Sequence, residues 1–542
     1  MTAFTGTVRL VRLALRRDRI QLPIWIGTLT LLAASLVPSI IEFYPTEKSR
    51  VELAISSANS PVSLMTNGLV SGTSIGATVA AQAMAMFLGV AFMSTLAVVR
   101  HTRQNEETGR AELVGSAVVG RHASLTAALI VVVGANVVLA LLSTVLLIGN
   151  DLPVGGSIAM GGGIGAVGVA FAAIAAVFAQ IFDSARAANG AAAAAIGVAF
   201  MLRAAGDAMG EVVDGGIRVV SAWPSWLSPI GWAQQIRPFD RDNWWLFGLF
   251  AVAFLGLIRL AFLLTEHRDV GAGMLATRPG PARAPSSLLG TLGLAWRLQR
   301  GVLLGWAIAM VAFGAAYGGI GDEIQDFAAD SQATEDIFQD LGSAGASVTD
   351  NYFAATFAIF GIAVAGYTVQ ALLRMRSEEA AGALESVLAT AVRRPAWMAS
   401  HITVAVLGTA TILALSGLAT GFTYGLIIGD VGGQVPTMVG AGLVQLPASL
   451  TLAGVVVAAF GLFPRRATAL AWGAFALCLI FGQLGPLLSL PQWVLDLSPF
   501  THLPAAPVED AAALPMTVLI AVGAGLVALG VAGFRRRDLA LS

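Results

Sequence analysis

The chain has 542 residues, of which 56% are apolar and only 12% are charged, with a net charge of −1. Soluble proteins carry roughly 25% charged residues, so this composition argues against a soluble enzyme and indicates a protein embedded in lipid. The 61 glycines agree with this interpretation, because small residues let transmembrane helices approach closely.

Cysteine and histidine offer no evidence for metal chemistry. The single cysteine, Cys478, lies in an apolar run and excludes both an intrachain disulfide and a cysteine zinc cluster. The five histidines are scattered, and none forms a helical pair with metal-ligand spacing. We therefore expect no metal site and no catalytic residue.

Twelve apolar runs are long enough to cross a membrane as helices. The first begins after five arginines but is too long for the core of a signal peptide, so we expect it to be retained. In chain order the runs are Leu22–Ile41, Ile75–Val99, Leu125–Ile148, Ser157–Ile181, Ala187–Met209, Trp244–Leu264, Val302–Ile320, Tyr352–Leu373, Ile402–Ile428, Thr437–Phe463, Thr468–Leu487 and Met516–Phe534.

The arginines predict the orientation. Most of the 31 basic residues fall on one side when the loops are numbered alternately, and basic loops are cytoplasmic. Both termini are therefore expected in the cytoplasm of a bacterium, with the chain in the plasma membrane. The opposite side carries an acidic loop from Asp322 to Asp350. That loop is either a solvated acidic helix or a vestibule that attracts cationic compounds.

The two sets of six runs resemble each other, which predicts a tandem duplication. Four matches occur in the same order: Leu13-Ala14-x-Arg16 with Leu294-Ala295-x-Arg297, an acidic segment after the second run of each set, Leu227-Ser228-Pro229 with Leu497-Ser498-Pro499, and Arg268-Asp269 with Arg537-Asp538. Since each set has an even number of spans, the two repeats have parallel topology. The predicted fold is all-α, with a first repeat over residues 1–264, a cytoplasmic linker over 265–290 and a second repeat over 291–542.

The acidic segments lie between the second and third spans of each repeat. The first reads Glu106-Glu107-x-Gly109-x-x-Glu112, and the second reads Glu378-Glu379-x-x-Gly382-x-x-Glu385 with one more residue before the glycine. Apolar residues follow at helical spacing, so each segment is expected to form a short amphipathic helix in a solvated cytoplasmic loop. Such a helix suits docking and not catalysis.

These segments resemble the cytoplasmic loop of type V ABC exporter permeases. The likeness extends to Trp226-Leu-Ser-Pro-Ile-Gly-Trp-Ala-Gln-Gln-Ile-Arg-Pro-Phe239 and to Gly533-Phe-Arg-Arg-Arg-Asp538, and together they are similar to the fused, twelve-span permeases of actinobacterial multidrug and polyketide-antibiotic exporters. The resemblance implies export of hydrophobic drugs or antibiotics. It also implies that Glu106, Glu107, Gly109 and Glu112, and Glu378, Glu379, Gly382 and Glu385, couple the permease to ATPase subunits. An ordinary solvated interfacial helix is the alternative.

ATP is expected to be handled by another chain. A Walker A loop needs a lysine to neutralise the nucleotide phosphates, and the only lysine, Lys48, follows Glu47 on the outer side. The expected partners are therefore two ABC ATPase subunits, which would bind ATP and Mg, together with membrane lipid and hydrophobic small molecules. No cofactor of this chain and no nucleic acid are expected.

Tryptophans gather before the sixth span, where Trp223, Trp226 and Trp232 precede Trp244 and Trp245. They predict a helix or re-entrant hairpin in the membrane interface, acting either as an anchor or as an outer gate. The resemblance places the substrate pathway along spans two, five, eight and eleven. Candidate wall residues, for which packing or lipid contact is the alternative, are Gln82, Met86, Phe87, Met93, Phe200, Met201, Phe357, Phe360, Phe475 and Phe481.

The main competing function is a proton-coupled secondary transporter of twelve spans, which is also built from two parallel halves. Such a transporter would carry acids within the membrane. The most polar membrane positions here are amides, and Arg203 and Asp207, one helical turn apart, are expected to pair near the outer end of span five.

Overall fold

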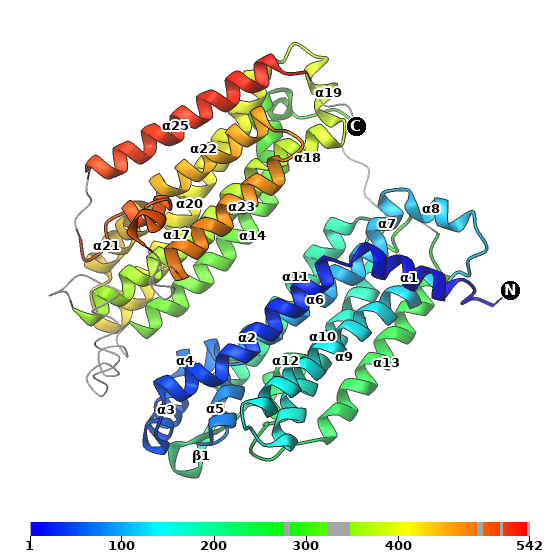
Figure 1. The fold of residues 1–542 in the computed structure, drawn as a ribbon, viewed down its shortest axis with the longest axis vertical. Coiled ribbons are helices and arrows are strands. Elements are labelled where there is room, and N and C mark those ends of the chain that lie inside the picture. The colour runs from blue at the N-terminus through cyan, green and yellow to red at the C-terminus, as the bar shows by residue number, and fades with distance from the viewer. Residues whose placement is uncertain are drawn as a thin grey trace. The chain divides into compact units, whose positions relative to one another are not determined.

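The chain is almost entirely helical in a computed structural model that describes residues 2–269, 271–275, 282–321, 347–484, 491–509 and 513–538 (Figure 1). It divides into two compact units, residues 1–280 and 281–542. Within the described residues, eleven helices are long and apolar enough to cross a membrane. The protein is therefore a polytopic helical membrane protein.

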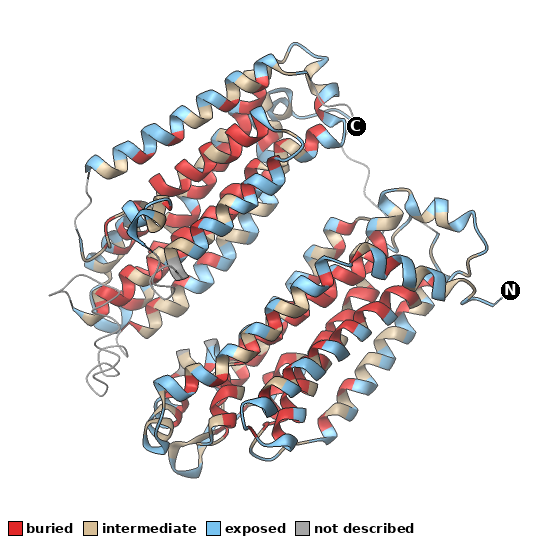
Figure 2. Ribbon diagram, in the orientation of Figure 1, coloured by how far each residue is buried: buried red, intermediate tan, exposed pale blue. Residues whose placement is uncertain are grey.

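The first unit is built around helix α10, which packs against α6, α9, α11 and α13. Its residues are mostly buried, whereas few residues of α2 and α13 are buried (Figure 2). The long helices of this unit and the helix that precedes them are α1 (Thr7–Arg17), α2 (Gln21–Phe43), α6 (Met84–His101), α9 (Ala123–Gly149), α10 (Val154–Ile181), α11 (Ala185–Ala208) and α13 (Trp245–Glu266).

Helix α10 can occupy the centre because it is rich in glycine and alanine. A Cβ atom on Gly168 would overlap the side-chain oxygen of Asn136 on α9. Asn136 is fully buried, and its amide nitrogen donates to Ser94 Oγ of α6 at 2.9 Å. The buried amide thus bonds across helices, as its place within an apolar run predicts.

Shorter elements close the end of the first unit that carries the predicted outer loops. The antiparallel strands β1 and β2 pair Glu211 with Val220. These elements are α3 (Glu47–Asn59), α4 (Pro61–Thr66), α5 (Ile75–Ala81), β1 (Glu211–Val213), η1 (Asp214–Gly216), β2 (Arg218–Val220), η2 (Trp223–Leu227) and α12 (Pro229–Gln235).

The second unit packs α14 against α20, α17 against both α20 and α22, and α22 against α25. Its core is aromatic, with Phe353, Tyr367, Trp397 and Phe460 fully or almost fully buried. The elements outside its docking segment are η3 (Ser286–Leu289), α14 (Thr291–Ile320), α17 (Val348–Leu372), α20 (Arg394–Ile428), α21 (Val431–Val444), α22 (Leu446–Leu462), α23 (Ala467–Leu479), a π-helical turn (Ile480–Leu484), α24 (Gln492–Leu495), η5 (Pro499–His502) and α25 (Ala513–Arg536).

Two spans expected to be continuous are interrupted at glutamines. The second span changes from α5 to α6 at Gln82, and the freed carbonyl of Ala81 accepts the Gly68 N–H at 2.7 Å. The tenth span changes from α21 to α22 at Gln445, because Pro447 has no N–H and cannot continue the helix bonds. Our expectation of an unbroken helix was wrong at Gln82. The tenth span remains one membrane-length run, Val431–Leu462, with a local turn at Gln445.

The expected eleventh span, Thr468–Leu487, is not among the eleven long helices. It begins as α23, which is apolar but only 13 residues long, and continues as the π-helical turn. Residues 485–487 of this run lie outside the described part of the chain, as do residues 322–346 of the acidic loop. Asp350 is described and lies in the first turn of α17, where Ser347 accepts its N–H.

The contact between α22 and α25 depends on glycines, and it yields a stability prediction. A Cβ atom on Gly530 would overlap the backbone carbonyl of Val457, whereas one on Gly525 would meet no atom. Gly530→Val should therefore lower the free energy of unfolding by about 1–3 kcal/mol through overpacking, measured by denaturation in detergent. Gly525→Val has the same propensity change and serves as the control. Equal loss in both variants would contradict this packing.

Candidate functional site

Each acidic segment consists of two short helices joined at a glycine. The first is α7 (Arg103–Glu107) and α8 (Arg110–Gly115), and the second is α18 (Arg374–Ala380) and α19 (Ala383–Leu388). Gly109 and Gly382 have φ values of 72° and 71°, in the left-handed region that other residues avoid. The single amphipathic helix that we expected is therefore a pair of helices with a turn between them.

The glycines correct the register between the two segments. Glu106 lies three residues before Gly109, and Glu379 lies three residues before Gly382. Glu106 is therefore equivalent to Glu379 and not to Glu378. With this pairing the segments have the same length, so the extra residue inferred from the paired glutamates is an artefact of the sequence match.

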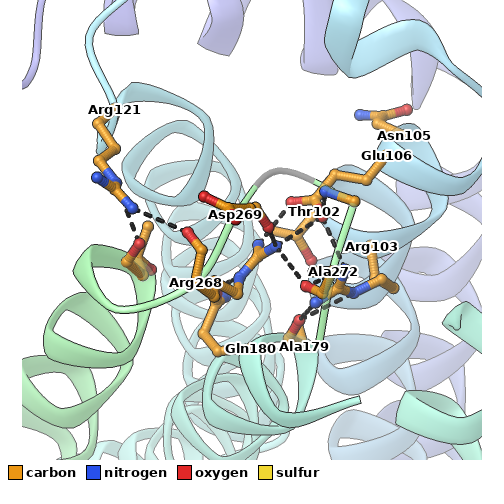
Figure 3. A network of polar contacts seen from close by, with 12 residues as sticks. Thr102, Arg103, Asn105, Glu106, Arg121, Ala179, Gln180, Arg268, Asp269 and Ala272 are labelled. Carbon is orange, nitrogen blue, oxygen red and sulfur yellow. Dashed lines mark hydrogen bonds and ion pairs between the residues drawn. The ribbon is translucent and has the colours of Figure 1, made fainter. Parts of the chain in front are cut away.

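The first cluster of charges surrounds Glu106 (Figure 3). Its two carboxylate oxygens bind Arg268 Nη2 at 2.6 Å and Arg103 Nη1 at 2.8 Å. Arg103 is fully buried and also donates to the carbonyl oxygen of Ala179 at the end of α10. The cluster thus joins α7 to α10 and to the residues that follow α13.

The second cluster repeats this arrangement around Glu379. Its carboxylate binds Arg537 Nη1 at 2.6 Å and Arg376 Nη1 at 3.3 Å. Arg537 follows α25 in the sequence as Arg268 follows α13, and it also donates to the carbonyl oxygen of Phe460 near the end of α22 at 3.5 Å. Each unit therefore carries one glutamate between two arginines.

A third arginine supports each cluster from the start of the next span. Arg121 donates to the carbonyl oxygens of Thr265 and Arg268 at 3.1 and 2.8 Å. Arg394 donates to those of Phe534 and Arg537 at 3.3 and 2.7 Å. Because these bonds neutralise backbone carbonyls at a helix C-terminus, they hold the chain that carries Arg268 or Arg537 in place.

The buried carboxylates differ from the solvated loop that the sequence predicted. The Glu379 side chain is only 2% exposed, and Glu378 is also buried, with Arg374 at 3.1 Å and His401 at 3.6 Å. Our expectation that Glu378 and Glu379 are solvated was wrong. The repeated Arg268-Asp269 and Arg537-Asp538 pairs were the available signal, but sequence alone gave them no partner.

Other members of the predicted docking set are accessible. Glu107 is exposed and accepts the N–H of Ala185 at the start of α11 at 3.2 Å. Glu112 on α8 and Glu385 on α19 are exposed, and the side chain of Leu113 beside Glu112 is 76% exposed. Both segments thus present an exposed glutamate on their second helix, and the first segment also presents Glu107.

The tryptophan-rich segment forms η2 and α12. Trp226 stacks on Trp245 of α13 with ring centroids 6.0 Å apart, and Trp232 Nε1 donates to the carbonyl oxygen of Trp226 at 2.6 Å. Trp223 is largely exposed. Helix α12 packs between α10 and α11, so this segment re-enters the first unit. Its role as an outer gate stays a prediction.

The predicted pathway residues fall into two groups. Met86, Phe87 and Met93 lie in the hydrophobic core of the first unit, and Phe357 and Phe360 lie in that of the second. The others keep exposed surface: Gln82, Phe200, Met201, Phe475 and Phe481. The pathway role of both groups stays a prediction.

The predicted pair of Arg203 and Asp207 is present on α11, with 3.5 Å between Arg203 Nη1 and Asp207 Oδ2. Both side chains are fully buried. Arg203 also donates to backbone carbonyls at the end of α4, including that of Met65 at 2.7 Å. In the described segments no group of three or more histidine, cysteine, aspartate or glutamate side chains is arranged to hold a metal ion.

These observations define a polytopic helical membrane protein with a repeated polar cluster at the end of its helices. A family model described as the multidrug efflux system permease Rv1217c, C-terminal domain, matches residues 288–535. The chain is 40% identical over 539 residues to the multidrug efflux system permease protein Rv1217c of Mycobacterium tuberculosis (strain ATCC 25618 / H37Rv), covering 99% of this chain and 96% of that protein. The chain belongs to this family of multidrug efflux permeases.

The buried clusters predict a large and selective effect on stability. Glu379→Ala leaves Arg376 and Arg537 without their shared carboxylate, so unfolding should become easier by about 3 kcal/mol. Glu385→Ala, on the exposed helix of the same segment, should change stability by less than about 0.5 kcal/mol. Thermal unfolding of the purified permease measures both. Equal stability of the two variants would show that the Glu379 cluster does not hold the fold.

Proposed function

We propose that the chain is the transmembrane permease subunit of an ATP-binding-cassette exporter that moves hydrophobic drugs or antibiotics out of the cell. The observation that carries this proposal is full-length similarity to a multidrug efflux system permease, together with one glycine-jointed segment per unit. ATP and Mg would be bound by separate nucleotide-binding subunits. The permease itself then needs only to move substrate and to respond to its partners.

The sole lysine supports the division of labour. Lys48 lies on the exposed helix α3 and pairs with Glu52 one turn away at 3.5 Å. A phosphate-binding loop needs its lysine beside a glycine-rich turn at a helix N-terminus. Lys48 lies in the first turn of α3, but the residues before it are Pro45, Thr46 and Glu47 and not a glycine-rich turn. This favours ATP hydrolysis by another chain.

The proposed topology is twelve spans in two six-helix repeats of parallel orientation, with both termini in the cytoplasm. The equivalent clusters around Glu106 and Glu379 support this repeat. Further support comes from Ser228 and Ser498, whose side chains each accept the N–H two residues later at the start of a short helix. On this topology α23 and the turn after it form the eleventh span.

The clusters suggest how ATP-driven movement would reach the membrane. The exposed helices α8 and α19 would meet the ATPase subunits through Glu112, Leu113 and Glu385. Through Gly109 and Gly382 they continue into α7 and α18, whose Glu106 and Glu379 the arginines fix to neighbouring spans. A push on either docking helix would then move several spans together, because the ion pairs resist separation in a low dielectric.

Two docking segments imply two ATPase subunits for each permease. Native mass spectrometry of the complex purified with its ATPase should show one copy of this chain with two nucleotide-binding subunits. A complex with one ATPase subunit, or with two permeases, would contradict the fused arrangement. Transport that needs a proton gradient and no ATPase would instead support the twelve-span secondary transporter.

The accessible glutamates provide the coupling test. Glu112→Arg together with Glu385→Arg should abolish drug resistance, since reversed charges oppose the groups that receive the docking helices. Each single reversal should have a smaller effect. Membrane expression should stay normal because both side chains are exposed. Glu211→Arg on the exposed strand β1 is the control. Normal transport and normal ATPase binding in the double variant would refute the docking role.

A further inference from the structure

The first unit contains a cavity of about 700 Å³ beside the Glu106 cluster. Helix α1 forms one wall, and the chain from α8 to the start of α9 forms another. Its lining is mixed: arginines lie with one carboxylate, Glu106, and with apolar side chains that include Leu13 and Val114. The arginines are Arg16, Arg17, Arg110, Arg121 and Arg268. This volume falls within the range of ligand sites, which is roughly 300–1,000 Å³.

Two of the cavity arginines, Arg17 and Arg110, have no counterpart in the second unit. The arginines of the Glu106 cluster do have counterparts there: Arg103, Arg121 and Arg268 recur as Arg376, Arg394 and Arg537. In contrast, Arg17 corresponds to Leu298 in the match of the N-terminal segments, and Arg110 corresponds to Ala383 when Gly109 is matched with Gly382. The second unit folds without these two charges, so their presence in the first indicates an added role.

The positive charge around Arg17 is only partly offset, because the nearby carboxylates are shared with other cations. Asp18 is paired with Arg100 and His101, and Glu106 with Arg103 and Arg268. The Arg17 side chain donates to the uncharged Asn105, and Arg110 is absent from the ion pairs of the described residues. Burial lowers the pKa of Arg17, and repulsion from Arg100 and Arg110 lowers it further. An anion in this cavity would relieve that repulsion.

The apolar part of the lining reaches membrane depth. Ala127 and Ala128 lie on the spanning helix α9, roughly 6–8 Å from its start at 1.5 Å per residue. Helix α1 is amphipathic, with its arginines beside the exposed side chains of Val8 and Leu15, as in helices that lie in a membrane interface. One side of the cavity is therefore cationic, at Arg17 and Arg110, and the other side is apolar, at Ala127 and Ala128 of α9. Their boundary lies at the level where lipid headgroups end.

We propose that this cavity binds the phosphodiester headgroup of an anionic phospholipid, with Arg17 and Arg110 on the phosphate and the acyl chains towards α9. A free phosphodiester would contact the arginines but would leave the apolar lining on α9 uncovered. An acidic protein segment would likewise not cover an apolar surface on a spanning helix. In the orientation proposed above, the bound lipid belongs to the cytoplasmic leaflet.

The test uses the delipidated full-length chain in a neutral detergent, titrated with phosphatidylglycerol and followed by native mass spectrometry. Arg17→Leu with Arg110→Ala copies the second unit and should weaken binding of one lipid about 30-fold, since each arginine at an anionic lipid surface contributes roughly a factor of five. Arg9→Leu with Arg12→Ala removes the same charge from exposed positions of α1 outside the cavity and should leave affinity within about twofold. Neutral phosphatidylcholine should bind weakly to every variant.

Further arms distinguish the alternatives. Arg110→Ala alone, at an exposed position, should cost about fivefold and remains informative should the double variant fold poorly. Glycerophosphoglycerol, the headgroup without acyl chains, should compete poorly. Equal loss in the cavity and control variants would overturn the site in favour of general surface attraction. Strong competition by the soluble headgroup would overturn the lipid assignment, and loss of ATPase co-purification with unchanged lipid binding would assign the cavity to a protein partner.

Discussion

The interaction on which the rest of the structure depends is the glutamate held between two arginines in each unit. Glu106 and Glu379 join a short helix between the second and third spans to arginines that follow the last span. A buried ion pair adds little net stability compared with apolar packing, but it is costly to separate. Its value here is geometric, because it fixes segments about 160 residues apart in the sequence at one position.

The glycine turn next to each cluster separates the helix that is attached to the spans from the helix that is available to a partner. The helix before Gly109 or Gly382 carries the glutamate that the arginines hold, whereas the helix after it presents an exposed glutamate, Glu112 or Glu385. A rigid connection between an exposed surface and the ends of several spans is what a subunit driven by external partners requires. The same arrangement in both units agrees with the proposed pair of ATPase subunits.

The two units share their cluster but differ elsewhere. In the first unit, Arg203 and Asp207 fasten α11 to the loop after α4 and to Ser221 and Ser225. The same unit carries Arg17 and Arg110 beside its cavity, where the second has Leu298 and Ala383. Two units that have equivalent clusters but differ in other charges share this arrangement of helices, while each unit has its own further contacts.

The sequence by itself determined the membrane class, the approximate bounds of most spans and the pair Arg203–Asp207, because apolar length and helical spacing are local properties. Only the tertiary structure decided that Glu379 is buried, that Glu106 is its equivalent, and that Arg268 and Arg537 are their partners. These facts depend on which distant segments meet, and local pattern carries no such information. The interruptions at Gln82 and Gln445 were missed for a related reason: hydropathy averages over about 19 residues and does not register a single interrupted turn.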